Sequence, residues 1–100
     1  MAVTYQQLLT NLPDQDARLL VLWSMGQRIY SNNVGDTSVF TDILNNSFNQ
    51  GYLVKTVQGL ERRDNQDWHY FEGVVAPEVA PMLAQLAQER LMLSRDPINI

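Results

Sequence analysis

The residue types that most often perform catalysis are sparse in this chain. His69 is the only histidine, and cysteine is absent. A histidine base requires a nucleophile or substrate within hydrogen-bond reach and a third group that orients its ring. The sequence shows no such arrangement, and one histidine without cysteine does not supply the ligands of a zinc site. We therefore expect no catalytic residue, metal or cofactor, and predict that the protein is not an enzyme.

One adjacent basic pair, Arg62-Arg63, could contact the phosphate groups of a nucleic acid. Acidic residues flank this pair at Glu61, Asp64 and Asp67, so that the local charge is neutral or negative. The alternative interpretation is a solvated turn with internal ion pairs, which contribute little to stability when exposed.

Trp68, Tyr70 and Phe71 form the densest aromatic cluster of the chain. On a β-strand, Trp68 and Tyr70 point to one face and Phe71 to the other. One of these faces must pack on the rest of the domain. The other face either packs in the core as well or meets a partner, because small monomers seldom expose a large apolar patch. The cluster therefore predicts a protein-interaction surface, with core packing alone as the alternative.

The overall composition is typical of one acidic globular domain. The 100 residues are 45% hydrophobic and 18% charged, and we predict a single domain over residues 1–100 with a short tail at 96–100. The net charge of −4 opposes binding to nucleic acid and to anionic membranes. No secretory signal or membrane-spanning run is apparent, and the lack of cysteine fits a reducing compartment. We expect a cytoplasmic protein that makes no membrane contact.

Periodicity, capping residues and breakers predict an α+β domain of three helices, a β-hairpin and a C-terminal helix. The second helix carries the apolar run at 19–23 and should lie at the centre of the fold. Thr4 followed by Gln7 forms a capping-box pattern at the start of the first helix. Asp36 or Thr37 should cap the third helix, and Gln58-Gly59 should form a bulge in the hairpin. The predicted helices cover residues 4–12, 14–30, 36–50 and 77–94, and the predicted strands cover residues 52–63 and 68–75, on either side of a turn at 64–67.

The apolar stripe of the C-terminal helix is wider than a small core requires, and Met82 adds adaptable apolar surface. This helix either closes the core or pairs with a second copy, so that a homodimer is one prediction. With the hairpin aromatics it completes the predicted protein-contact set, which consists of Trp68, Tyr70, Phe71, Met82, Leu86 and Leu93.

This order of elements resembles the winged-helix family. The resemblance covers residues 14–95, with 37–51 as the equivalent of the recognition helix and 52–57 and 68–72 as the wing. It lies in the order of the elements and includes no signature motif. The resemblance implies a winged-helix-like fold and, in a DNA-binding member, contacts from the third helix and the wing. The residues that would make those contacts are Asn46, Asn49, Arg62 and Arg63.

The charge of the predicted third helix separates two function hypotheses. Residues 36–50 contain no Lys or Arg and carry Asp36 and Asp42, a charge that opposes docking between phosphates. We therefore expect a regulatory or adaptor domain that acts through protein contacts. The alternative is a dimeric winged-helix transcription regulator that binds DNA.

Overall fold

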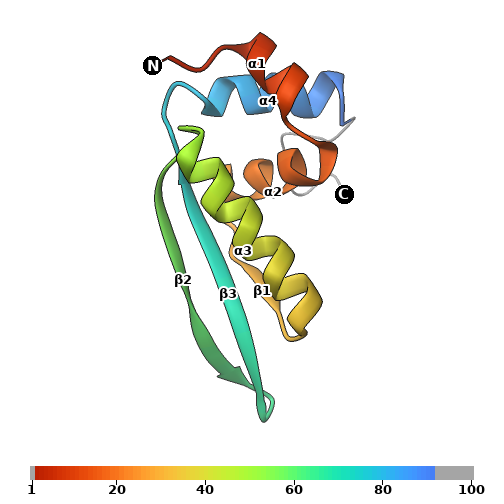
Figure 1. Ribbon diagram of the computed structural model, residues 1–100, viewed down its shortest axis with the longest axis vertical. Coiled ribbons are helices and arrows are strands. Elements are labelled where there is room, and N and C mark those ends of the chain that lie inside the picture. Colours follow the sequence, from red (N-terminus) through yellow and green to blue (C-terminus); the bar gives the residue numbers. More distant parts are fainter. Residues whose placement is uncertain (1, 92–100) are drawn as a thin grey trace.

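The computed structural model describes residues 2–91 and shows an α+β domain with a three-stranded antiparallel sheet (Figure 1). The α+β class predicted from the sequence is confirmed, and the sheet contains one strand more than predicted. The helices are α1 (Tyr5–Asn11), α2 (Asp14–Ser24), α3 (Val34–Asn49) and α4 (Ala80–Glu89), and the strands are β1 (Ile29–Ser31), β2 (Leu53–Arg63) and β3 (Gln66–Val75).

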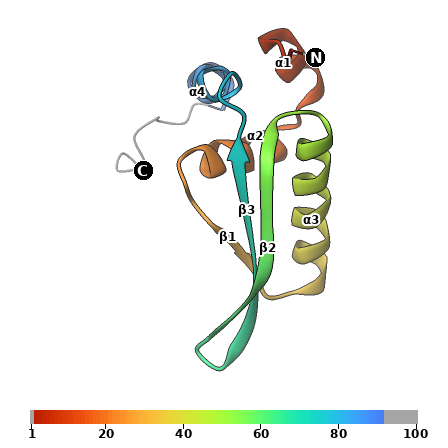
Figure 2. The same ribbon diagram turned by 90° about the vertical axis from the view of Figure 1, so that its left-hand side faces the viewer.

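The strand order β1-β3-β2 makes β3 the central strand and leaves β2 at an edge of the sheet. The long helix α3 packs along one face, whereas α1, α2 and α4 gather at the end where β3 leads into α4 (Figures 1 and 2). The tip of the hairpin extends past the N-terminal end of α3. Over the middle and tip of the hairpin, no helix of the described chain covers the face opposite α3.

Local capping explains where the first and third helices begin. Thr4 Oγ1 accepts a hydrogen bond from the Gln7 amide, and the Thr4 amide donates to Gln7 Oε1, which is the capping box expected from the sequence. Asn33 begins α3, because its Oδ1 accepts from the Asp36 amide at 2.7 Å. The prediction that Asp36 or Thr37 caps this helix is therefore wrong.

The second helix ends six residues earlier than predicted, at Ser24 instead of Tyr30. Gly26 adopts a φ of +79°, and the Gln27 amide donates to the Leu22 carbonyl at 3.0 Å. These are features of a Schellman motif, which terminates a helix in a left-handed residue. The chain then extends into β1, where Ile29 pairs with Phe71 of β3. The predicted loop at 31–35 is thus divided between the end of β1 and the start of α3.

The hairpin is confirmed, but its turn is tighter than the predicted segment 64–67. Only Asp64 and Asn65 form the turn, and their φ values of +52° and +64° identify it as type I′. Gly59 pairs in regular register with Tyr70, so the predicted bulge at Gln58-Gly59 is wrong. The register shift lies between Leu53 and Lys55, at the other end of β2.

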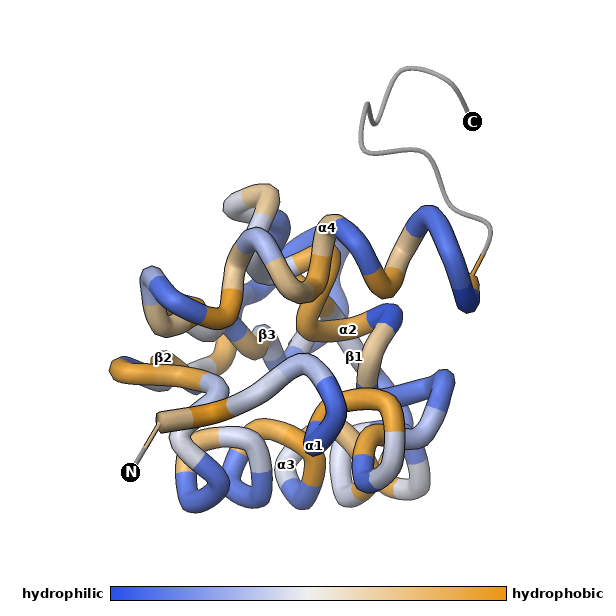
Figure 3. The backbone as a smooth tube through the Cα atoms, turned by 90° about the horizontal axis from the view of Figure 1, so that it is seen from above, coloured by the Kyte–Doolittle hydropathy of each residue, from blue (hydrophilic) through white to orange (hydrophobic). Residues whose placement is uncertain are grey.

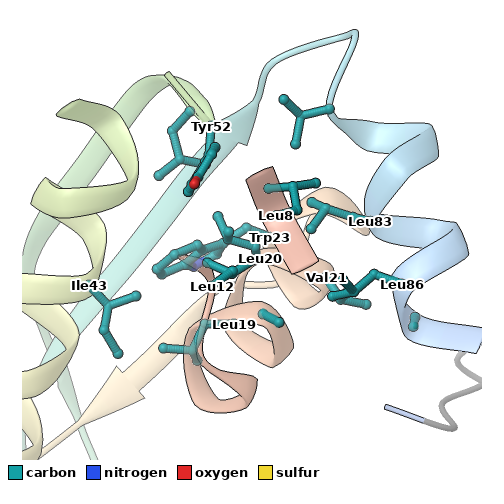
Figure 4. Packing of buried hydrophobic residues seen from close by; sticks show 14 of the residues in the cluster. Leu8, Leu12, Leu19, Leu20, Val21, Trp23, Ile43, Tyr52, Leu83 and Leu86 are labelled. Carbon is teal, nitrogen blue, oxygen red and sulfur yellow. The ribbon is translucent and has the colours of Figure 1, made fainter. Parts of the chain in front are cut away.

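The core lies where the helices meet the sheet. In Figure 3 the hydrophobic stretch of α2 lies between α4 on one side and α1 and α3 on the other. Trp23 of α2 is 3% exposed, and its Nε1 donates to the Phe71 carbonyl at 3.1 Å. Phe71 in turn meets the Phe40 ring edge-on, with centroids 5.7 Å apart. Figure 4 shows Trp23 and Leu20 beside Ile43 of α3, with Leu83 and Leu86 of α4 on the opposite side.

Replacing Trp23 by Phe should destabilise the domain while it preserves most of the buried ring. The substitution removes the indole N–H that donates to the Phe71 carbonyl, and it also removes part of the buried ring system. We expect the two losses together to lower the free energy of unfolding by at least about 1–3 kcal/mol. Urea denaturation followed by circular dichroism measures this change. A Trp23→Phe variant as stable as the wild type would show that the hydrogen bond contributes nothing.

Candidate functional site

The sheet face that no helix of residues 2–91 covers carries a distinctive arrangement of aromatic and charged side chains. Residues that lie directly opposite one another in an antiparallel ladder point to the same side. Tyr70 pairs with Tyr30 and with Gly59, and Trp68 pairs with Glu61, so these residues share the face opposite Phe71. We call this surface the open face and define it by Arg28, Tyr30, Lys55, Val57, Glu61, Arg63, Trp68, Tyr70, Glu72 and Val74.

Arg28 and Arg63 each lie over a tyrosine ring of the open face. The Arg28 guanidinium carbon lies 4.2 Å from the Tyr70 ring centroid, and the corresponding distance from Arg63 to Tyr30 is 5.0 Å. Such stacks are attractive because the ring face is electronegative. Both guanidinium groups therefore lie over the sheet surface, while the Arg63 side chain remains 54% exposed.

Carboxylates complete this network. Arg28 Nη2 lies 2.7 Å from Glu72 Oε1, and Arg28 Nε donates to the same oxygen at 2.8 Å. Glu61 lies between the two arginines, with one oxygen 3.8 Å from Arg28 Nη1 and the other 3.8 Å from Arg63 Nε. The open face therefore presents flat aromatic rings and guanidinium groups, and neighbouring carboxylates balance most of the positive charge of the arginines.

Gly59 lets the Tyr70 ring lie flat on the neighbouring strand. A β-carbon at position 59 would lie 2.5 Å from Tyr70 Oη and 2.6 Å from Tyr70 Cζ. Contacts this short are not tolerated, so only glycine permits this ring position. Gly59, for which the sequence suggested a bulge, instead leaves the space that the Tyr70 ring occupies.

The structure divides the predicted protein-contact set between surface and core. Trp68 and Tyr70 lie partly exposed on the open face. Phe71 and Leu86 are 1% and 0% exposed and belong to the core. Met82 is partly buried against the same core. Leu93 lies outside the described residues. The prediction that the C-terminal helix covers residues 77–94 is wrong at both ends, because α4 spans only Ala80–Glu89 and the Leu91 amide already donates to the Leu86 carbonyl, five residues back instead of four.

The predicted DNA-contact residues are not brought together. Asn46 and Asn49 are exposed near the C-terminal end of α3, whereas Arg62 and Arg63 lie at the hairpin tip, beyond its N-terminal end (Figure 1). Arg62 Nη1 pairs with Asp67 Oδ1 at 3.1 Å, and Arg63 stacks on the open face. Each arginine thus engages neighbouring groups, as the solvated-turn interpretation describes.

His69 is exposed on the side of β3 that faces α3, where it pairs with Ser31 and Leu60. Together with Asp67 it borders a shallow depression at the start of α3. Over residues 2–91, no three His, Asp or Glu side chains lie close enough together to hold a metal ion. Of the described helices, none combines the length and the apolar character that a membrane span requires.

A polar hollow of about 370 Å³, which the sequence did not indicate, lies where α1 and α2 meet the end of α3. Its lining comes from distant segments and includes Asn46, Asp16 and Tyr52. Burial raises the pKa of the Asp16 carboxyl above its usual value, with partial opposition from a backbone hydrogen bond, and burial also raises the pKa of Tyr52. The ionised Asp16 therefore carries a desolvation cost in the folded state.

Replacing Gly59 by Ala should displace the Tyr70 ring and disrupt its stack with Arg28. Because the clashing atoms are the far end of a partly exposed side chain that can rotate away, we expect a loss of at most about 1 kcal/mol in the free energy of unfolding, the usual contribution of an exposed cation–π stack. The same substitution in a Tyr70→Ala background should cost clearly less, because the clashing ring is absent. Equal costs in the two backgrounds, measured by urea denaturation, would contradict the contact.

The Asp16→Asn variant should change the pH dependence of stability. Because the folded pKa of Asp16 is raised, the wild type loses stability as pH rises from the unfolded-state pKa of about 3.9 through the folded value. Asn has no ionised form, so the variant should gain stability relative to wild type at neutral pH and lose this advantage near pH 3. A stability difference between the two proteins that does not vary with pH would rule out the desolvation effect.

Comparison with known proteins gives no relative of this chain: no protein-family model, no curated protein and no solved structure matches it.

Proposed function

We propose that this protein is a non-enzymatic regulatory or adaptor domain that binds a protein partner through the open face. The observation that carries the proposal is the row of Tyr30, Trp68 and Tyr70 on a sheet face that no described helix covers, with Arg28 and Arg63 stacked on the tyrosines. Aromatic residues and arginine are the types most enriched in protein–protein interfaces and among their hot spots. A cytoplasmic location, expected from the sequence, belongs to the same proposal.

The charge of the open face favours a protein over a nucleic acid. Glu61 and Glu72 lie against the arginines, so the guanidinium groups already have anionic neighbours. A phosphate backbone would have to displace these carboxylates and approach a chain of net charge −4. A protein surface with acidic and basic groups around an apolar centre can bind both the arginines and the carboxylates and leave their mutual ion pairs in place.

Trp68 is the expected anchor of this interface. It is partly exposed and lies opposite Glu61 toward the hairpin tip. Truncating a hot-spot aromatic residue typically weakens binding by 2 kcal/mol or more, which is about 30-fold in Kd. We therefore expect Trp68→Ala to abolish capture of the partner at protein concentrations near the wild-type Kd.

Quantitative capture from native lysate tests this proposal with a matched control. Val34 is 88% exposed and lies at the start of α3, away from the open face, so Val34→Ala removes apolar surface elsewhere. The same partner should be captured by wild type and Val34→Ala and lost with Trp68→Ala, with unchanged circular dichroism in all three. Equal capture by both variants, or no partner for the wild type, would refute the proposal.

A dimeric winged-helix DNA-binding regulator is the second candidate. It is supported by the projecting hairpin and by the exposed amides of Asn46 and Asn49 on α3. The strand β1 between α2 and α3 departs from the short turn that joins the two helices of a helix-turn-helix motif. Gel retardation at low salt, with wild type and a variant in which Arg62 and Arg63 are both Ala, tests it. Salt-dependent binding that weakens in the variant would support this function, and no retardation of any duplex would exclude it.

A further inference from the structure

The outer edge of β2 presents unpaired backbone groups along a long strand. Within residues 2–91, β2 has only β3 as a neighbour, and it contains no proline. A two-residue type I′ turn is flanked by a residue pair that exchanges both backbone hydrogen bonds, here Arg63 and Gln66. From that pair onward, the residues of β2 direct their backbone N–H and C=O groups alternately toward β3 and away from it. The groups that point away from the sheet are those of Thr56, Gln58, Leu60 and Arg62.

Little protects this edge from further pairing. Exposed edge strands are usually short, bulged, interrupted by proline or covered. Here the register shift lies only at the start of β2, and residues 55–63 pair with β3 without interruption. Leu60 is 63% exposed on this segment. The result is a regular edge with an apolar side chain near its middle.

We propose that a second copy of this chain pairs with the edge, β2 against β2 in antiparallel orientation, with the two-fold axis at Gln58. This inference goes beyond the proposed function, because it rests on the backbone groups at the β2 edge, with only Lys55 and Glu61 of the open face taking part beside that edge, and it requires no other protein. Pairing at this edge satisfies the outward backbone groups of both copies and joins two three-stranded sheets into one of six strands.

Charge complementarity selects the axis. With the axis at Gln58, Lys55 of each copy lies opposite Glu61 of the other, so two pairs of opposite charge form. Moving the axis to Gly59 places Lys55 opposite Arg63, which is repulsive. An axis at Val57 or Leu60 pairs no opposite charges.

The side chains available at the edge fit this register. Lys55 is exposed, and the described residues give it no ion pair within 4 Å. Glu61 has only the two longer contacts of 3.8 Å and can therefore accept a closer ammonium group. On the other face of the sheet, the exposed Leu60 comes to lie against Thr56 of the second copy. The two open faces then lie on the same side of the six-stranded sheet.

Cysteine cross-linking tests the axis directly, because the natural sequence contains no cysteine. In Gln58→Cys the two thiols of a dimer would face each other across a hydrogen-bonded pair, with Cα atoms about 5.5 Å apart, a distance that a disulfide spans. In the control Thr56→Cys, the thiol would face Leu60 of the second copy. The introduced thiols of the two copies would lie roughly 13 Å apart along the strands. Mild oxidation of dilute protein should link Gln58→Cys rapidly and Thr56→Cys slowly. Equal rates for the two variants would overturn the register.

Charge reversal tests the interface without new covalent chemistry. Lys55→Glu and Glu61→Lys each turn both cross-strand pairs into like-charge pairs, so each should weaken dimerisation about tenfold in analytical ultracentrifugation, and the double variant should restore it. Gln58→Pro should give a monomer with a wild-type circular dichroism spectrum, because the lost N–H points away from β3 and proline is tolerated on that side of an edge strand. A wild-type chain that stays monomeric at its highest soluble concentration, or a double variant as weak as the single ones, would overturn the proposal. Neither result depends on whether the open face captures a partner.

Discussion

The contact between Trp23 and Phe71 sets the arrangement of the whole domain. Phe71 lies in the central strand, where it pairs with Ile29 of β1 on one side and Gln58 of β2 on the other. Its carbonyl accepts the Trp23 indole N–H from α2, and its ring packs on Phe40 of α3. Two helices and all three strands therefore meet at one residue that is 1% exposed. A hydrogen bond is directional, so this buried contact constrains the orientation of the Trp23 ring against the sheet as well as its distance.

The composition of the open face follows from that constraint. Side chains alternate along a strand, so the inward position of Phe71 places Tyr70 and Glu72 on the opposite face. A slip of one residue along β3 would turn Phe71 outward and bury the charged Glu72 in its place. The partly exposed aromatic residues of the open face are thus compatible with a well-packed core, because the face toward α3 has its own aromatic residues.

Features that lie within one helix or strand could be predicted from the sequence, whereas contacts between distant segments could not. The capping box of Thr4 and Gln7 and the alternation of β3 predicted α1 and the hairpin. Strand β1 is only three residues long, too short for a period to emerge, and its pairing with β3 spans about 40 residues of sequence. Arg28 gave no signal because its partners Tyr70 and Glu72 are brought to it only by that pairing. The sequence could not show that Phe71 and Leu86 lie in the core instead of at a contact surface, because apolar residues occur in both places.

The distribution of charge distinguishes the open face from α3 as a contact surface. Lys55, Arg28 and Arg63, three of the seven basic residues of the chain, belong to the open face. The exposed side of α3 instead carries Asp36 and Asp42 and no basic residue. A helix that binds in a DNA groove requires basic residues on its exposed side, toward the phosphates. The stacked arginines also lose less conformational freedom on binding than free side chains would, because their neighbours already orient them. The sheet that Phe71 holds in register thus presents, on its other side, two arginines that stacking and ion pairs already orient toward a partner.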